Sequence, residues 1–341
     1  MKLPELLDAR ARWRGPALAV DRSWIQPLEA AERAELSAAA EALQERPLAE
    51  IGRVPLPALS AAVRRWRAEL RDGIGFVLVR GVPVEGRGEA AITRMFWLLG
   101  RELGEAVPQN GAGDLVCHVR DTGADPADVN TRLYTTRAEQ DFHTDGADII
   151  GLLALRGARS GGVSRIVSSV SVFEAVARQR PDLAELLFEE WFFHLHGEFP
   201  PGFPAYFQMP ICRWDGRHLA TFFLGWYIRR AQSLPDVPRL TAAREELLAL
   251  YEATANDPAL YLDMEFQPGD LQWLKNSVIL HKRTAYEDHE DPAQKRHLLR
   301  LWLTARDFED GDERLRAGMG SGGPDRDGPG ATKARAPSAP R

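Results

Sequence analysis

Short apolar runs, separated by turn residues, occupy much of the middle and rear of the chain. Runs of this length, rich in β-branched and aromatic side chains, predict strands. The pair Asp215-Gly216 between two such runs is a strong signal for a tight β-hairpin. The predicted strands are residues 75–79, 149–155 and 164–172, the two arms of 209–223, the two arms of 264–281, and residues 297–305.

Other segments have the apolar spacing of amphipathic helices, with hydrophobic side chains three and four residues apart. Ser171 and Glu174 have the spacing of a capping box, which predicts that a helix begins there. The remaining predicted helices are residues 28–43, 90–103 and 241–255.

Several short strands with a few helices outside them favour a barrel or sandwich over a repeating βαβ unit. We therefore predict a mainly β fold with flanking helices. Residues 1–72 are expected to form a helical and extended segment that packs on the barrel, and residues 73–317 the main domain. In residues 318–341, ten of 24 residues are Gly or Pro and Met319 is the only large apolar side chain, which predicts a disordered tail.

The composition excludes several classes of protein. With 43 basic and 49 acidic residues among 341, the net charge of −6 has the wrong sign for a general nucleic-acid binder. No apolar run approaches the ~18 residues of a membrane span, and charge precedes any apolar signal core at the N-terminus. Cys117 and Cys212 lie too far apart for a zinc ribbon or a disulfide framework. A cytoplasmic protein is expected, and association into a homo-oligomer is left open.

The sequence His143-Thr144-Asp145, together with His281 located 138 residues downstream, suggests a metal site. In extended backbone, residues i and i+2 share a face, so His143 and Asp145 can converge on one ion while Thr144 faces away. Two imidazoles and a carboxylate on one side of an ion leave the opposite positions open, as non-haem Fe(II) oxygenases require.

Two arginines follow His281 at spacings that place them on one face of the strand predicted at 297–305. Arg296 and Arg300 can both project into the barrel that holds the metal, where a buried guanidinium needs a partner. The distal carboxylate of a dicarboxylate co-substrate would supply that partner, because arginine binds carboxylates through two parallel hydrogen bonds. Ser164, just past the turn Gly161-Gly162, can add a hydroxyl donor.

These motifs together, in residues 142–175 and 268–303, resemble the TauD/TfdA family of Fe(II)- and 2-oxoglutarate-dependent dioxygenases. The resemblance extends from about residue 73 to residue 307. It implies a double-stranded β-helix, also called a jelly roll and cupin-like, with flanking helices. It also implies that 2-oxoglutarate is converted to succinate and CO₂ while a C–H bond of a small-molecule substrate is hydroxylated or otherwise oxidised.

By this resemblance, His143, Asp145 and His281 match the iron ligands and Arg296 matches the arginine that binds the distal carboxylate of 2-oxoglutarate. Ser164 matches a Thr or Ser on the same carboxylate. The position of Arg300 contacts an anionic substrate group in some members, and Glu139 lies where relatives place substrate contacts.

Two positions qualify the resemblance. Many relatives read His-Gly-Arg where this chain reads His281-Lys282-Arg283, so the bulkier lysine puts the shape of the nearby pocket in doubt. Related halogenases carry a small residue at the position of Asp145, which opens a site for chloride. The carboxylate here predicts hydroxylation instead.

Alternative readings remain open. His194 and His196 offer a second i, i+2 pair, which would suit a cupin-type metalloenzyme that does not use 2-oxoglutarate. A metal-free small-molecule binding protein on the same barrel is the other alternative. Four further histidines have no partner pattern and are expected to be surface or packing residues, namely His118, His218, His289 and His297.

Overall fold

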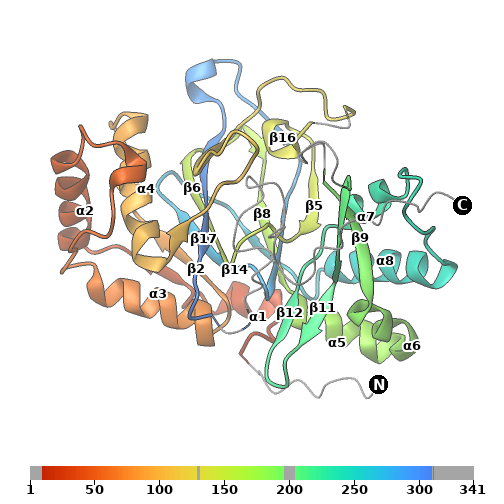
Figure 1. Ribbon diagram of the computed structural model, residues 1–341. Coiled ribbons are helices and arrows are strands. Elements are labelled where there is room, and N and C mark those ends of the chain that lie inside the picture. The colour runs from red at the N-terminus through yellow and green to blue at the C-terminus, as the bar shows by residue number, and fades with distance from the viewer. Residues whose placement is uncertain (1–9, 129–130, 196–203, 309, 311–341) are drawn as a thin grey trace, which may run out of the picture.

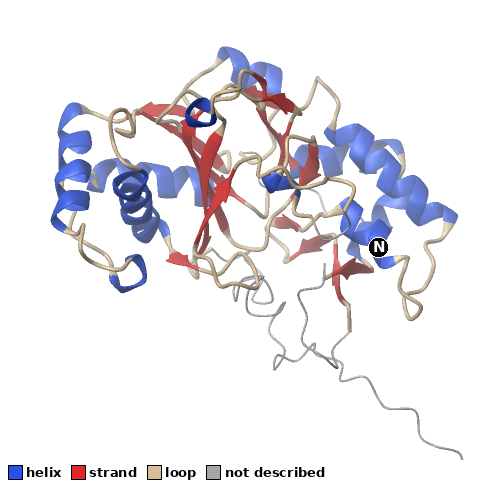
Figure 2. Ribbon diagram, turned by 90° about the horizontal axis from the view of Figure 1, so that it is seen from above, coloured by secondary structure: helices blue, strands red, loops and turns tan. Residues whose placement is uncertain are grey.

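A strand-rich core between two groups of helices forms the body of the protein (Figures 1 and 2). The computed structural model describes residues 10–128, 131–195, 204–308 and 310. Within these residues, no helix has the length and apolar character needed to cross a membrane. The predicted tail, residues 318–341, lies outside the described residues.

The larger sheet contains seven strands among the described residues, in the order β1-β2-β14-β6-β17-β3, with β4 also pairing with β17. Its pairs are antiparallel except for β1 and β2, which run parallel. The strands are β1 (Ile25–Pro27), β2 (Phe76–Arg80), β3 (Glu105–Ala106), β4 (Val116–Val119), β6 (Ile149–Arg156), β14 (Leu271–Lys275) and β17 (His297–Thr304).

The smaller sheet carries His143, Ser164, His281 and Arg283. Its four described strands have the order β13-β8-β15-β5 and pair antiparallel throughout. They are β5 (Gln140–His143), β8 (Ser164–Ser168), β13 (Leu262–Met264) and β15 (Ile279–Arg283). Two-stranded pairs complete the β structure: β7 (Ser160–Gly161) with β16 (Tyr286–Glu287), β9 (Glu190–His194) with β10 (Tyr206–Pro210), and β11 (Cys212–Trp214) with β12 (Leu219–Thr221).

The helices cover the two outer sides of the strands. In Figure 1, α2, α3 and α4 lie beside the larger sheet, and α5, α6 and α8 lie on the opposite side of the molecule. The α-helices are α1 (Gly15–Val20), α2 (Ala30–Ala42), α3 (Ser60–Asp72), α4 (Glu89–Leu103), α5 (Ser169–Gln179), α6 (Pro181–Ala184), α7 (Gly225–Ala231) and α8 (Ala242–Ala255). The 3₁₀ helices are η1 (Leu48–Glu50), η2 (Leu133–Thr135), η3 (Glu185–Phe188) and η4 (Pro292–Gln294).

Side chains of the larger sheet alternate between two cores, as the two-residue period of a strand requires. On β2, Phe76 and Leu78 belong to the core between the two sheets, whereas Val77 and Val79 pack with the side chains of α2, α3 and α4. Helix α4 lies so close to β17 that a Cβ at Gly100 would be 2.2 Å from the Leu301 side chain. This tight packing holds β17 in place, so its inward side chains have fixed positions.

Most sequence predictions of secondary structure are confirmed. The predicted helices correspond to α2, α4 and α8, and Asp215-Gly216 joins β11 to β12. The prediction for residues 164–172 is wrong at its end, because β8 stops at Ser168 and α5 begins at Ser169. The cap is Ser168, whose Oγ accepts a hydrogen bond from the backbone N–H of Ser171. The Ser171 hydroxyl instead donates to the carbonyl of Trp13, so it does not cap the helix.

Candidate functional site

His143 and His281 face each other across two adjacent strands of the smaller sheet. They are direct partners in the antiparallel register of β5 and β15. Residues in this relation project to the same side of a sheet, and the two ring centroids are 4.2 Å apart. The strand pairing therefore brings together two histidines that are separated by 138 residues in the sequence.

Asp145 completes a cluster of three with these histidines. Its Oδ1 lies 3.8 Å from His143 Nε2 and its Oδ2 lies 3.6 Å from His281 Nε2. All three side chains are buried, and their donor atoms are mutually close enough to hold one metal ion. Thr144 faces away as predicted, with its Oγ1 accepting from the backbone N–H of Phe223. Two imidazoles and one carboxylate form a donor set that suits iron(II).

Neighbouring groups fix the orientation of the cluster. His143 Nδ1 lies 2.7 Å from the carbonyl oxygen of Asp141, which leaves Nε2 directed toward the other two side chains. The side chain of Asn276 both donates to the carbonyl of Asp145 and accepts from its backbone N–H, at 2.6 and 2.8 Å. Trp302 Nε1 donates to Asp145 Oδ2 at 3.0 Å.

The protonation states suit metal binding. Burial, together with the neighbouring His281, lowers the pKa of His143 to about 3, so this imidazole is neutral at pH 7. Burial alone would raise the pKa of Asp145, but Arg300 and the two imidazoles outweigh burial and lower this pKa well below its ordinary value. The cluster therefore offers a carboxylate and a neutral imidazole, the forms that coordinate a cation.

A cavity beside the cluster contains two arginines without a carboxylate partner. Arg283 and Arg296 line it together with His143 and His281, and it is partly open to solvent. Among the described residues neither arginine forms an ion pair, and Arg283 Nε, Arg283 Nη1 and Arg296 Nη1 are buried without a hydrogen bond. Burial, with Arg283 nearby, lowers the pKa of Arg296 to about 10.

Such an arrangement is unfavourable unless an anion joins it, because desolvated like charges destabilise each other. Both guanidinium carbons lie 5.1 Å from the centroid of the Tyr286 ring, so both charges lie beside the same side chain. A dicarboxylate that reaches from the metal cluster to this pair supplies the missing acceptors. The residues present therefore fit 2-oxoglutarate.

A second cavity adjoins the cluster and shares four lining residues with the first cavity, among them His143 and Arg300. Asp145 lines only this second cavity, together with Trp226 and Tyr227. The cluster thus borders two adjoining spaces, one with the unpaired arginines and one with aromatic walls.

Comparisons with known proteins agree with this geometry. The family described as "Taurine catabolism dioxygenase TauD, TfdA family" matches residues 40–302. The chain belongs to this family. A relative in Streptomyces rubellomurinus, named FR-33289 synthase, is 32% identical over 88% of this chain and 91% of its own length. A "taurine hydroxylase-like protein" of Stachybotrys chartarum is 28% identical over 88% of this chain and 80% of its own.

Solved structures of similar shape include asparagine oxygenase, with a TM-score of 0.61 and 19% identity over 82% of this chain and 94% of that one. The non-heme iron oxygenase OrfP gives 0.60 and 16% over 88% of this chain and 100% of that one. These likenesses support the predicted double-stranded β-helix. Membership of the TauD/TfdA family confirms the predicted enzyme class, an Fe(II)- and 2-oxoglutarate-dependent oxygenase.

The structure also locates the residues of this TauD/TfdA enzyme that were predicted to contact 2-oxoglutarate and the substrate. Ser164 and Arg296 both line the first cavity, and Ser164 Oγ lies 3.3 Å from Gln272 Oε1. Gly162, with φ of +68°, leaves room for Arg296, because a Cβ there would lie 2.9 Å from Arg296 Nε. Arg300 is held by Gln109 Oε1 at 2.8 Å and lies 3.5 Å from Asp145 Oδ2.

Glu139 lies in neither of the two cavities described here. Its carboxylate instead pairs with Lys282 Nζ at 2.5 Å. Lys282 Nζ also donates to Asn256 Oδ1 at 2.8 Å. Lys282 lines the first cavity, as its position beside His281 suggested, and its ammonium group is held by these polar partners.

Three residues that orient or extend the site were missed in the sequence, although a signal exists for two of them. Arg283 lies two residues after His281 on β15, and Trp302 lies two residues after Arg300 on β17. The same alternation that relates Arg296 to Arg300 predicts that both face inward. Asn276 lies in the loop between β14 and β15, where no periodicity reveals a contact with Asp145.

The alternative histidine pair is not assembled within the described residues. His194 lies on β9, and it belongs to neither of the two His and carboxylate clusters found there. His196 lies outside the described residues. Burial and Arg230 lower the pKa of His194.

Proposed function

We propose that His143, Asp145 and His281 hold Fe(II) and that Arg296, assisted by Ser164, binds the distal carboxylate of 2-oxoglutarate. The observation that carries this proposal is the pair of buried guanidinium groups in the cavity that the two ligand imidazoles also line. When bound, iron with 2-oxoglutarate and O₂ supplies the oxidation of a C–H bond, and 2-oxoglutarate leaves as succinate and CO₂.

The protein positions the reactants and stabilises charge. Arg296 offers a planar fork that matches a carboxylate, and Tyr286 limits the motion of that fork from one side. Trp302 and Asn276 hold Asp145 so that its carboxylate stays directed at the histidines. Burial of all three ligands keeps bulk water away from the reacting atoms.

Hydroxylation is the reaction that the ligand set favours. Asp145 occupies the position that a halogenase needs to leave open for chloride. Asparagine oxygenase, a structural neighbour, is described with Fe(II), 3-hydroxyasparagine and succinate, which supports hydroxylation with release of succinate.

The second cavity supports a small organic anion as the primary substrate. Arg132 and Arg300 line this cavity beside Trp226 and Tyr227, so a charged end and an apolar body are both accommodated. Arg300 already lies near one carboxylate, that of Asp145, and its guanidinium can bind a second anion on its open side. The role predicted for Glu139 stays a prediction, to be tested beside Arg300.

A succinate assay tests this proposal. Candidate substrates are added as matched pairs, each acid beside its methyl ester or amide, to enzyme with Fe(II), 2-oxoglutarate and O₂. We expect some acids to stimulate succinate formation and their neutral partners to fail, and Arg300→Gln to remove this difference. Equal stimulation by both partners would contradict the anionic substrate class.

The same assay separates the alternative functions. Oxidation of a substrate without any need for 2-oxoglutarate would favour a cupin-type metalloenzyme. A protein that binds small molecules with neither Fe(II) binding nor succinate formation would favour the metal-free binding protein.

A further inference from the structure

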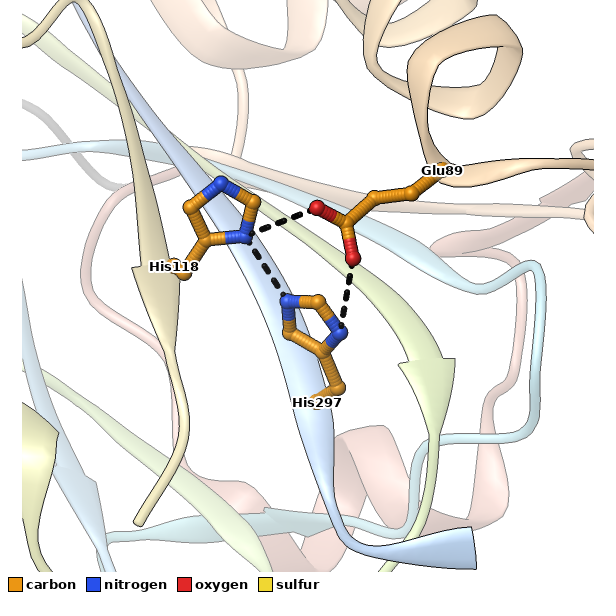
Figure 3. Close-up of side chains that lie close together, drawn as sticks. All are labelled: Glu89, His118 and His297. Atoms are coloured by element: carbon orange, nitrogen blue, oxygen red, sulfur yellow. Dashed lines mark hydrogen bonds and ion pairs between the residues drawn. The ribbon is translucent and has the colours of Figure 1, made fainter. Parts of the chain in front are cut away.

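A second cluster of two histidines and a carboxylate lies outside the two cavities. Figure 3 shows Glu89, His118 and His297 converging from α4, β4 and β17. His118 Nδ1 is 2.9 Å from His297 Nε2 and 3.6 Å from Glu89 Oε1. The other carboxylate oxygen, Oε2, is 3.6 Å from His297 Nδ1. The sequence shows no partner pattern for His118 and His297, whereas the structure brings them into contact with each other and with Glu89.

This cluster lies on the opposite face of β17 from the co-substrate cavity. Arg296, Leu298 and Arg300 line that cavity, and His297 alternates with them. The His297 side chain is 0% exposed, whereas 37% of His118 and 48% of Glu89 are accessible. An ion can therefore reach the cluster from solvent and still contact a buried ligand.

We propose that Glu89, His118 and His297 form a second metal site, which takes a divalent transition ion such as Zn²⁺. Tetrahedral bonds of about 2.0–2.2 Å place ligand atoms roughly 3.3 Å apart. The separations of 2.9 and 3.6 Å lie on either side of that value. Imidazole nitrogens and one carboxylate are a donor set that zinc accepts, and the exposed side of the cluster leaves the fourth position to water.

One proton must move when the ion binds. Without metal, Arg156 Nη2 lies 3.2 Å from His297 Nδ1, so Nδ1 accepts and Nε2–H donates to His118. Coordination by Nε2 shifts the His297 proton to Nδ1, beside Glu89 Oε2, and Arg156 gives up this hydrogen bond. The His297 ring keeps one proton, so it remains a neutral imidazole and does not become an imidazolate. The three ligands together carry one negative charge, that of the Glu89 carboxylate.

Arg156 therefore opposes metal binding in two ways, through its hydrogen bond and through its charge. If the cluster binds a metal, replacing Arg156 should therefore change the metal affinity. A cluster that only forms hydrogen bonds would show no such effect. Removal of the guanidinium should strengthen binding at this site and leave the His143, Asp145 and His281 site unaffected, because Arg156 lines neither cavity.

The experiment is a calorimetric titration of the full-length, metal-free protein with Zn²⁺. Zinc also suits the first cluster, so His281→Ala provides a background in which the first cluster lacks one of its three ligands. We expect this variant to bind one ion, with a rise in melting temperature. Adding His118→Ala or Glu89→Gln should abolish both effects. The control His218→Ala, which changes an exposed histidine bonded to Asp215, should change neither.

Arg156→Gln in the same background should bind Zn²⁺ more tightly. Absence of binding in His281→Ala, or binding that survives His118→Ala, would overturn the proposal and leave the cluster as hydrogen-bonded packing. Failure of the iron site gives a different result. In that case the wild-type protein binds one ion, which His118→Ala abolishes and His281→Ala does not.

Discussion

Trp302 donates its indole N–H to Asp145 Oδ2 across 3.0 Å, from a strand of the larger sheet to a ligand of the proposed iron site. The bond fixes one carboxylate oxygen and leaves the other for the cation. Groups that hold metal ligands in this way typically contribute 10- to 100-fold to metal affinity.

Trp302→Phe should therefore weaken Fe(II) binding by roughly 10- to 100-fold, because the indole N–H that bonds Asp145 is lost while a smaller aromatic ring remains in its place. Anaerobic titration with Fe(II), monitored by calorimetry, measures this change. Trp226→Phe, a change in the wall of the second cavity, is the matched control and should keep the affinity. Unchanged affinity in Trp302→Phe would show that the hydrogen bond does not orient the ligand.

Arg296, just before β17, and Arg300, on β17, should behave differently. Arg296→Ala removes the guanidinium that pairs with the distal carboxylate of 2-oxoglutarate. Removing one member of a buried ion pair typically costs about 3–5 kcal/mol. Binding of 2-oxoglutarate should weaken by roughly 10²- to 10³-fold or more. Arg296→Lys should restore only part of it, since an ammonium lacks the planar fork.

Arg300→Ala should keep the affinity for 2-oxoglutarate within a few-fold and uncouple succinate formation from substrate oxidation. Calorimetry measures the affinity, and the ratio of succinate to oxidised substrate measures the coupling. Loss of 2-oxoglutarate binding in the Arg300 variant, with binding kept in the Arg296 variant, would exchange the two roles.

Gly162 should control the position of Arg296. Its φ of +68° disfavours any side chain, and a Cβ would meet Arg296 Nε at 2.9 Å. Gly162→Ala should weaken 2-oxoglutarate binding by about tenfold or more, because the new methyl group displaces the guanidinium of Arg296. The left-handed conformation costs roughly 1–2 kcal/mol of folding stability besides. Gly157→Ala, where a Cβ meets open space, is the control. Equal affinities in the two variants would contradict this role.

Acid should destabilise the metal-free protein. Burial and neighbouring charges lower the pKa of both His143 and His297 to about 3, whereas an unfolded chain binds these protons near pH 6.5. The unfolded state therefore binds more protons between pH 6.5 and 3, so stability falls as the pH falls through this window, by about 1.4 kcal/mol per pH unit for each proton.

Urea denaturation in the presence of a chelator, repeated from pH 7 to pH 4, measures this slope. His297→Gln should reduce by one the difference in bound protons between the unfolded and folded states. The free energy of unfolding should then depend less steeply on pH, even if the substitution changes its value at pH 7. A wild-type slope in His297→Gln would mean that His297 is already protonated in the folded protein.

The core of the candidate iron site could be predicted because its signals are local. His143-Thr144-Asp145 encodes its geometry in three residues, and strand alternation relates Arg296 to Arg300. Trp302 and Arg283 follow the same rule, but alternation gives only the face of a strand and not the partner that a side chain contacts there. The error at α5 arose because Ser168 and Ser171 are both suitable caps, and only the tertiary contact with Trp13 chooses between them.

Other features depend on contacts that no local pattern records. Glu89, His118 and His297 come from three separate elements, and their approach depends on how α4 packs against β17. The pairing of Glu139 with Lys282 similarly depends on the spacing of β15 from the segment before β5. Such relationships become visible only when the sheets are assembled.

Anaerobic titration of the Fe(II) protein with 2-oxoglutarate, followed by visible absorption, tests the central claim most directly. We predict a charge-transfer band in the wild-type protein, because 2-oxoglutarate chelates an iron held by His143, Asp145 and His281. The band should be absent in His281→Ala and should need roughly 10²- to 10³-fold more 2-oxoglutarate in Arg296→Ala. A band that persists unchanged in His281→Ala, or no band in the wild-type protein, would contradict the account.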